Sequence, residues 1–323
     1  MPPEVSGNRV ALASCSGLVV SYDRRTGERI WEYDVKADGD AQTFHGELAR
    51  RDSSLFIAVD GIGGNVYRFD SRTGDVVWKW RSNAGVSSDL VLRGDTLVLV
   101  TNDNRLTTLD AATGWVYWQT EAAEGSRSIA PVKPTPTFLN NELIFGRADG
   151  RVAGYHLSSS EPLWETWLPA GVTTDLVGSG DAVILGTLDG SVCRLDTDGD
   201  IVGQVQIGAT PTYRWMVIDG FLIGLTKVAG ADRELIALDA NTLEQRWRLR
   251  SPHAKGWTTA QPAWGWGSVI VGDSEPALYA VDPRSGEIRW RAKTDHPPRT
   301  VSVDGNELFM GTFGGTLDVY KRH

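Results

Sequence analysis

Asp70-Ser71-Arg72-Thr73-Gly74-Asp75-Val76-Val77-Trp78 is the stretch that decides the fold of this chain, because its pattern returns along the whole sequence. The pattern is of the type Asp-x-x-Thr-Gly-x-x-x-Trp. An aspartate that ends a strand can accept backbone N–H hydrogen bonds from the turn that follows, and glycine permits a left-handed backbone step into the next strand. The stretch therefore predicts a tight turn between two antiparallel strands, with the tryptophan in the second strand.

The pattern recurs at a regular spacing. Three other copies are equally clear and begin at Asp23, Asp110 and Asp282, each with its tryptophan in the same place. Weaker copies keep the frame but lose letters, with Ser160 for glycine after His156, Gly203 for tryptophan after Asp196, and Leu243 for glycine after Asp239. Lys321 marks a shortened eighth copy, so the copies begin at residues 23, 70, 110, 156, 196, 239, 282 and 321. A spacing of about forty residues is typical of one four-stranded β-propeller blade per repeat.

Within each repeat, apolar and polar residues alternate with a period of two, which is typical of half-buried β-strands. In the second repeat the strands are expected at 47–50, 55–59, 66–69 and 76–80. A hairpin turn is expected six residues before each Asp pattern, at a position where a positive φ costs little. This position is held by Gly17, Gly64, Asn104, Gly150, Gly190 and Gly315.

The strand count favours eight blades. A first strand is expected at 4–7, three more follow to Tyr33, six complete blades come next, and three strands end near Arg322. Seven blades would leave strands over, whereas eight lack one strand, so the last blade either stays three-stranded or takes up residues near Met1. The sequence thus predicts an all-β chain that forms a single eight-bladed β-propeller of four-stranded antiparallel blades, one domain over residues 1–323.

Composition narrows the classes of partner. The chain is 41% hydrophobic and 23% charged, with a net charge of −9 and no acidic or basic block. This is the composition of a globular protein with a core, and it argues against a surface that follows nucleic-acid phosphates. No stretch of about eighteen apolar residues is present, so no membrane span is expected.

The two cysteines, Cys15 and Cys193, are too few and too far apart for a zinc cluster, and both are expected to be reduced core residues. Residues 12–15 read Leu-Ala-Ser-Cys, like a lipoprotein cleavage box, but residues 1–10 supply neither a basic start nor a long apolar stretch. We interpret the box as coincidence and expect a cytoplasmic protein, unless a leader has been removed.

The repeated pattern resembles that of the pyrroloquinoline-quinone (PQQ) repeat family of β-propellers, and the resemblance covers essentially the whole chain. It implies that each motif tryptophan packs between neighbouring blades and fastens them. The family includes quinone-dependent alcohol dehydrogenases, outer-membrane assembly lipoproteins of the BamB type, and sensor domains. The resemblance to BamB-like eight-bladed propellers implies a docking platform that performs no chemistry.

Quinone-dependent dehydrogenases of this family are much longer and commonly carry a disulfide between adjacent cysteines, whereas the cysteines here are far apart. The chain also offers only part of the indole, cationic and amide groups that PQQ would need. No His-Glu-x-x-His, Gly-x-Ser-x-Gly or phosphate-loop motif occurs. We therefore expect no cofactor and no metal, and we favour a binding scaffold over an enzyme.

Candidate site residues come from the entry to the inner strand of each blade, since these loops gather at one face of a propeller, around its channel. His45, Lys133, Arg214 and Arg299 come from alternate blades and are expected to suit an anion, with the Thr174 and Thr258 hydroxyls beside them and Trp257 as a stacking wall. If the protein is an enzyme, acid–base work is assigned to His45 with Glu47 or Asp89.

Two questions remain open at this point, namely the role of the cationic residues and the function of the protein. Instead of binding an anion, the cationic residues are equally well expected to form ion pairs with Asp89 and Asp175 around a water-filled channel. The leading hypothesis is a scaffold that binds a protein or peptide at the rim formed by the long loops 120–136 and 251–263. The rival is a cofactor-independent cyclase, isomerase or lyase acting on a small anionic metabolite at the channel mouth.

Overall fold

The computed structural model describes residues 2–14, 16–39, 43–61, 63–122, 133–228, 233–253, 256–258, 261–313 and 315–322. Cys15, most of the long loop 120–136, and residues 254–255 and 259–260 of the long loop 251–263 lie outside the described residues. By their internal contacts the residues form two compact units, Met1–Pro136 with Tyr155–Leu163, and Thr137–Gly154 with Trp164–His323. Each unit is described by itself, and the single domain over 1–323 stays a prediction.

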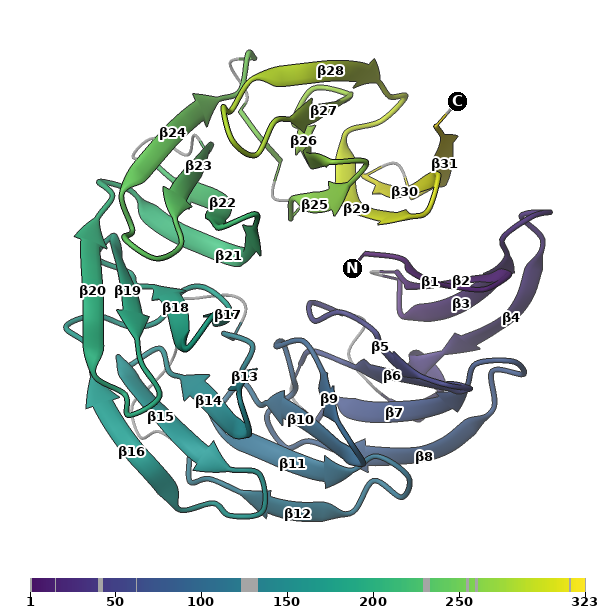
Figure 1. Ribbon diagram of the computed structural model, residues 1–323. Coiled ribbons are helices and arrows are strands. Elements are labelled where there is room, and N and C mark those ends of the chain that lie inside the picture. The colour runs from purple at the N-terminus through teal and green to yellow at the C-terminus, as the bar shows by residue number, and fades with distance from the viewer. Residues whose placement is uncertain are drawn as a thin grey trace. The chain divides into compact units, whose positions relative to one another are not determined.

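The first unit contains three complete four-stranded sheets, in which neighbouring strands follow one another in chain order (Figure 1). Their strands are β1 (Glu4–Ser6), β2 (Arg9–Ala13), β3 (Leu18–Asp23), β4 (Arg29–Asp34); β5 (Ala49–Arg51), β6 (Ser54–Ala58), β7 (Asn65–Asp70), β8 (Val76–Arg81); and β9 (Val91–Arg93), β10 (Thr96–Val100), β11 (Leu106–Asp110), β12 (Val116–Gln119). A short 3-10 helix, η1 (Val35–Asp38), follows β4.

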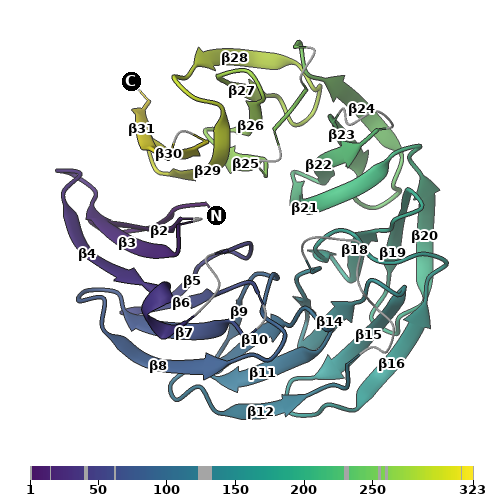
Figure 2. The ribbon, with the colours of Figure 1, turned by 180° about the vertical axis from the view of Figure 1, so that it is seen from behind.

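A fourth sheet contains β13 (Thr137–Leu139), β14 (Glu142–Gly146), β15 (Arg151–His156) and β16 (Pro162–Trp167). The remaining sheets belong to the second unit and repeat the same order (Figure 2). Their strands are β17 (Val177–Ser179), β18 (Ala182–Gly186), β19 (Ser191–Leu195), β20 (Ile201–Gln206); β21 (Thr210–Ile218), β22 (Phe221–Lys227), β23 (Arg233–Asp239), β24 (Gln245–Arg250); β25 (Ala263–Gly265), β26 (Ser268–Asp273), β27 (Ala277–Val281), β28 (Ile288–Lys293); and β29 (Pro298–Asp304), β30 (Glu307–Thr312), β31 (Leu317–Lys321).

The predicted fold class, an all-β eight-bladed propeller of antiparallel four-stranded blades, is confirmed by these eight successive sheets. The last blade has three strands among the described residues, and β1 near the start of the chain pairs with β2 in the first blade. Within a blade each strand runs antiparallel to the one before it. The turn between the second and third strands therefore lies at the same end of the sheet as the loop that leads to the next blade.

The repeated pattern forms the turn that was predicted. In the second blade the Asp70 carboxylate accepts a hydrogen bond from the backbone N–H of Arg72 at 2.8 Å, and the Gly74 N–H bonds the Asp70 carbonyl at 2.8 Å. Gly74 has a φ of +81°, the left-handed conformation that glycine adopts without steric cost. The hairpin position differs in this blade, because the positive φ falls on Gly63 rather than the predicted Gly64.

The motif tryptophans fasten neighbouring blades, as the family resemblance implied. In four copies the indole N–H group donates to the carbonyl of the residue that follows the first position of the next copy. The bonds are Trp31 to Ser71 at 3.0 Å, Trp78 to Ala111 at 3.2 Å, Trp118 to Leu157 at 2.8 Å, and Trp247 to Pro283 at 2.9 Å. The hydrophobic core accordingly lies between adjacent sheets, for example where Phe56, Val66 and Leu97 pack together with Trp78.

Candidate functional site

A chain of polar contacts joins loops of three successive blades in the first unit, all from the ends where one blade leads to the next. The His45 imidazole Nδ1 lies 2.5 Å from a carboxylate oxygen of Asp60, and the other oxygen accepts from the Asn102 amide at 2.5 Å. Ser87 donates to the Asn102 carbonyl oxygen at 2.7 Å, and the backbone N–H of Lys133 donates to Ser87 at 3.1 Å. We call these five residues the polar loop cluster.

Two charged groups of this cluster have shifted pKa values. Burial alone would raise the pKa of Asp60, but hydrogen bonds from His45 and Asn102 outweigh it and hold the pKa below the ordinary value. Lys133 is only 3% exposed. Burial lowers the pKa of its ammonium group from 10.5 to about 8, although the charges of Asp103 and Asp60 act in the opposite direction.

The burial of Lys133 predicts a dependence of stability on pH. Between pH 8 and 10.5 the unfolded chain keeps the lysine proton and the folded chain loses it, so folding gains free energy as the pH rises through this window. Relative to Lys133→Met, which cannot titrate, raising the pH from about 7 to about 9.5 is expected to stabilise the wild type by about 2 kcal/mol. Urea unfolding of both proteins at the two pH values measures this difference, and parallel curves would contradict it.

Asp89, one of the residues assigned to acid–base work, bonds the backbone in the contacts seen here. An Asp89 carboxylate oxygen accepts from the backbone N–H of Glu47 at 2.6 Å, and the Asp89 N–H donates to Thr135 at 3.1 Å. Asp89 is buried. These bonds tie together the loops that enter the second, third and fourth blades, and they place Asp89 in a structural position, while its catalytic role stays a prediction.

In the second unit, the predicted hydroxyl groups are engaged with the backbone. The Gly186 N–H donates to the Thr174 hydroxyl at 2.8 Å, and the Thr258 hydroxyl donates to the Gly272 carbonyl at 3.3 Å. Ser88 of the third blade accepts from the Val100 N–H in the same way, at 2.9 Å. The recurrence in three blades indicates that this hydroxyl fixes the entry loop to the second strand of its own blade.

The other predicted binding residues of this unit make contacts of different types. Arg214 is 3.4 Å from the Asp175 carboxylate, and the Arg299 guanidinium lies 5.6 Å from the centroid of the Phe313 ring. Trp257 is buried in the core, where its indole meets Tyr279 edge-on with ring centroids 5.4 Å apart. Trp257 therefore stabilises the blade, and this structure presents no open indole face there. The convergence of residues from both units on one axis stays a prediction.

Sequence reasoning missed the acidic and amide partners at the hairpin turns, namely Asp60 and Asn102. The sequence signalled only other acidic residues at these turns, because Asp103, Asp149 and Asp189 each precede the hairpin residue by one position. Thr101 and Thr187 donate to Asp103 at 2.5 Å and to Asp189 at 2.6 Å. The repeat thus places a carboxylate at the loop end of successive blades.

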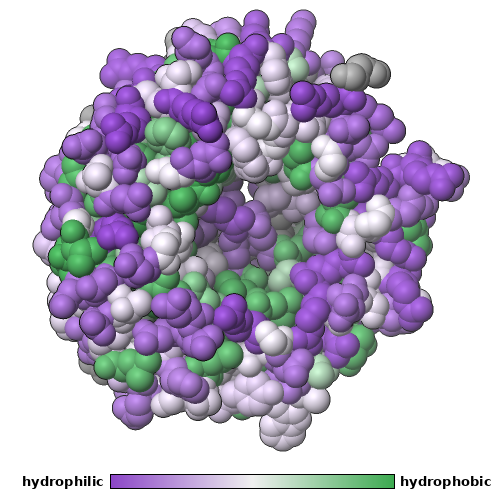
Figure 3. Space-filling view, in the orientation of Figure 1, coloured by the Kyte–Doolittle hydropathy of each residue, from purple (hydrophilic) through white to green (hydrophobic). Residues whose placement is uncertain are grey.

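It also missed exposed hydrophobic side chains at the loop ends of the second unit. Trp167 ends β16, Leu188 lies in the turn between β18 and β19, and Phe313 follows β30, and all three are exposed. The Leu188 carbonyl accepts from Thr210 at 3.4 Å, so its turn is held to the next blade. Figure 3 shows that hydrophobic groups on one face of the molecule form separate patches among hydrophilic side chains. Such patches are a common basis for protein docking.

Three further observations concern metal binding, thiol reactivity and membrane-spanning helices. Within the described ranges, no three His, Cys, Asp or Glu side chains lie close enough to hold a metal ion. Cys193 is a buried free thiol whose pKa burial raises to about 11, which disfavours the reactive thiolate. In the part of the chain that the structure describes, no helix has the length and apolar character required to cross a membrane.

Comparisons with known proteins point to one family. The family model described as outer membrane protein assembly factor BamB matches residues 15–171 and 216–317. A curated protein of the same description from Burkholderia pseudomallei (strain K96243) is 25% identical over 223 residues, which cover 63% of this chain and 55% of that protein. The chain thus matches only about half the length of this relative.

Solved structures show the same fold. The crystal structure of BamB from Moraxella catarrhalis is similar with a TM-score of 0.81 at 20% identity, covering 99% of this chain and 96% of that chain. The computationally designed Ika8 protein is similar with a TM-score of 0.79 at 16% identity, covering 99% and 95%. At these identities the likeness establishes the fold and nothing about activity.

The expectation of a cytoplasmic protein is wrong. Both the matching family model and the Burkholderia relative are described as an outer membrane protein assembly factor, which points to the outer membrane rather than the cytoplasm. The expectation rested on the lack of a leader pattern at the start of the sequence, and such a lack does not determine where a protein resides.

Proposed function

The chain belongs to the family described as outer membrane protein assembly factor BamB, and from that premise we propose that it is a non-catalytic scaffold that binds protein partners in outer membrane protein assembly. The family match carries the proposal. It extends over most of the chain, residues 15–171 and 216–317.

The polar loop cluster supports this proposal. His45, Asp60, Asn102 and Ser87 hydrogen-bond one another in sequence. Arg214 has Asp175 beside it. Polar groups that satisfy each other fix the shape of a surface, and a fixed surface binds partners at a lower entropic cost.

The docking surface is assigned to the loop ends of the second unit. Trp167, Leu188 and Phe313 present large apolar side chains there, and Arg299 lies against Phe313. Aromatic and arginine side chains contribute most of the binding energy at many protein interfaces. Partners are therefore expected to lose affinity when these side chains are truncated.

The proposal is tested in the host. Deletion of the gene is expected to lower the amounts of proteins in the outer membrane fraction, measured by quantitative mass spectrometry, and the wild-type gene is expected to restore them. A Trp167→Ala, Leu188→Ala, Phe313→Ala variant should fail to restore them, although loss of exposed side chains leaves folding nearly unchanged. The matched control Ile201→Ala, Val202→Ala removes two exposed side chains from β20 and should restore them fully. Unchanged outer membrane proteins in the deletion strain would refute the proposal.

A second candidate function is supported by the His45–Asp60 pair and the buried Lys133 amine. Together they suit binding of a small anionic metabolite, with His45 available for proton transfer. Native mass spectrometry of protein purified from host lysate separates the two functions. A bound mass of metabolite size that disappears in Lys133→Met would support the second candidate, and a bound protein with no such mass would support the scaffold.

A further inference from the structure

The third repeat breaks a rule that the other copies keep. The residue after the motif glycine, or after the residue that replaces it, is acidic in all the other complete copies, namely Glu28, Asp75, Glu161, Asp200, Glu244 and Glu287. In the third copy it is Trp115. This tryptophan is 76% exposed, the most exposed large hydrophobic side chain among the described residues.

The turn itself does not require a tryptophan at this position. The Trp115 backbone N–H donates to the Thr113 hydroxyl at 3.3 Å. Asp75 makes the same bond to Thr73 at 3.3 Å, and Glu28 makes it to Thr26 at 3.2 Å. Since an acidic residue fits an identical turn, the exposed indole has no role in folding that the repeat reveals.

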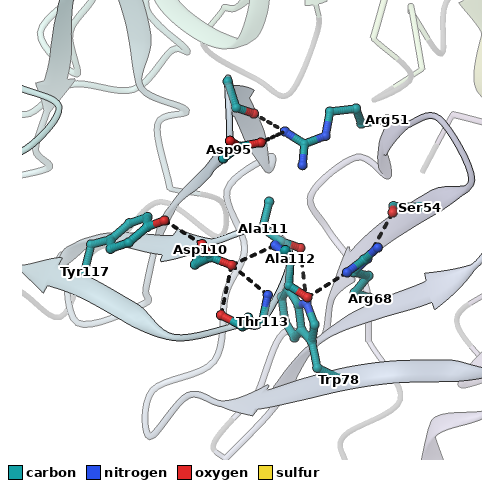
Figure 4. A network of polar contacts seen from close by, with 11 residues as sticks. Arg51, Ser54, Arg68, Trp78, Asp95, Asp110, Ala111, Ala112, Thr113 and Tyr117 are labelled. Carbon is teal, nitrogen blue, oxygen red and sulfur yellow. Dashed lines mark hydrogen bonds and ion pairs between the residues drawn. The ribbon is translucent and has the colours of Figure 1, made fainter.

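The turn that carries Trp115 is firmly held (Figure 4). The Asp110 carboxylate accepts from the Thr113 N–H at 2.7 Å and from the Tyr117 hydroxyl at 2.6 Å. From the second blade, Arg68 donates to the Ala112 carbonyl at 2.6 Å, and the Trp78 indole donates to the Ala111 carbonyl at 3.2 Å. A side chain on a fixed turn is suited to act as a binding anchor, because little backbone freedom is lost on binding.

Exposed negative charge accompanies the aromatic side chains. Tyr117 is 53% exposed. The Asp95 side chain is 87% exposed and lies 3.2 Å from Arg51, whose side chain is 34% exposed and also donates to the Gly94 carbonyl. The Ala111 backbone N–H donates to the Asp95 carbonyl at 2.8 Å, so residue 95 lies beside the turn that carries Trp115. Aromatic faces beside a carboxylate favour a cation.

From these features we propose that Trp115, Tyr117 and Asp95 form a docking surface for an arginine-bearing extended segment of a protein partner. The guanidinium stacks on the exposed aromatic rings and pairs with the Asp95 carboxylate. The antiparallel order of β9 to β12 places residues 94–95 and 111–115 at the end of the third blade opposite to the polar loop cluster. None of these residues belongs to the docking surface assigned to the second unit, so the two proposals can be tested independently.

The test uses the full chain labelled with 5-fluorotryptophan and a defined probe, the peptide acetyl-Gly-Ser-Val-Arg-Val-Arg-Val-Ser-amide. The matched peptide carries citrulline, the neutral isostere of arginine, at both arginine positions. We expect the arginine peptide to shift the ¹⁹F resonance that is lost in Trp115→Gln, and to bind at least about tenfold more tightly than the citrulline peptide. Trp115→Gln and Asp95→Asn should each weaken binding by about tenfold, whereas Trp264→Gln, another exposed tryptophan, should leave it unchanged.

Several results would overturn the proposal. Equal binding of the two peptides would show that no cation is recognised. Unchanged binding to Trp115→Gln, or a shift of other resonances only, would place the peptide elsewhere. Sedimentation that shows a dimer of the wild type and a monomer of Trp115→Gln would identify a second copy of the chain as the occupant. None of these results bears on the host test of the docking surface in the second unit.

Discussion

Trp247→Ala is expected to lower the free energy of unfolding by about 3 to 5 kcal/mol, the range for truncation of a large aromatic side chain in a core. Trp247 is 8% exposed and lies in a core cluster with residues of β22, β23, β26 and β27. Its indole N–H also donates to the Pro283 carbonyl. Truncation would leave a cavity between the sixth and seventh blades and a carbonyl without its donor. Denaturant unfolding followed by circular dichroism measures the loss.

Two variants make this prediction specific. Trp167→Ala removes the same side chain from a position that is 64% exposed, and it should change stability by less than about 0.5 kcal/mol. Trp247→Phe keeps an aromatic ring but removes the donor to Pro283, and an intermediate loss of about 1 to 3 kcal/mol is expected. A similar loss for Trp247→Ala and Trp167→Ala would show that packing between blades is not what the motif tryptophan provides.

The sequence was sufficient to predict the blades because one turn with one spacing recurs through the chain. The copies that lack the motif tryptophan or glycine also have a physical explanation. The Gly74 and Gly114 positions lie against Trp31 and Trp78 of the preceding blade, where a Cβ atom would stand 2.7 and 2.8 Å from the indole. The fifth repeat lacks this tryptophan at Gly203, and in the next repeat Leu243 replaces glycine. Leu243 is buried, and its Cδ1 would lie 3.6 Å from a Cβ at Gly203. The leucine therefore occupies space that an indole fills in other blades.

The site was predicted less well, because sequence spacing identifies which loops meet but not how their side chains pair. His45 and Lys133 were chosen as cations, yet their surroundings are set by Asp60, Asn102 and Ser87 in other loops. Trp257 shows the same limit, since its place in a long loop suggested exposure and its ring is buried. Contacts between blades depend on side-chain directions that no period-two pattern specifies.

The location of the protein lay beyond such reasoning altogether. Fold and loop chemistry are compatible with many cellular compartments, and only the similarity to outer membrane protein assembly factors corrected the expectation of a cytoplasmic protein. The exposed Trp115 is different, because comparison of the copies within the sequence singles it out without any relative. Repeats thus supply an internal reference for deciding which residues the fold does not require.

Gly114→Ala is expected to destabilise the protein through two separable costs. Gly114 has a φ of +78°, where a residue with a Cβ pays about 1 to 2 kcal/mol. The added Cβ would also stand 2.8 Å from the Trp78 indole, which is held by its hydrogen bond to Ala111. Displacing a packed ring typically costs a further 1 to 3 kcal/mol, so a total loss of about 2 to 5 kcal/mol is expected in denaturant unfolding.

Gly27→Ala is the matched control, because the first copy has the same turn with a φ of +72° and nothing within 4 Å of a Cβ atom. This variant should show the backbone cost alone, and the difference between the two variants measures contact with the tryptophan. If that contact is the cause, Gly114→Ala in a Trp78→Ala background should cost no more than Gly27→Ala in the wild type. Equal losses of stability for Gly114→Ala and Gly27→Ala in the wild-type background would mean that glycine is needed only for its backbone conformation. The pairing of tryptophan with glycine between successive blades would then lose its physical basis.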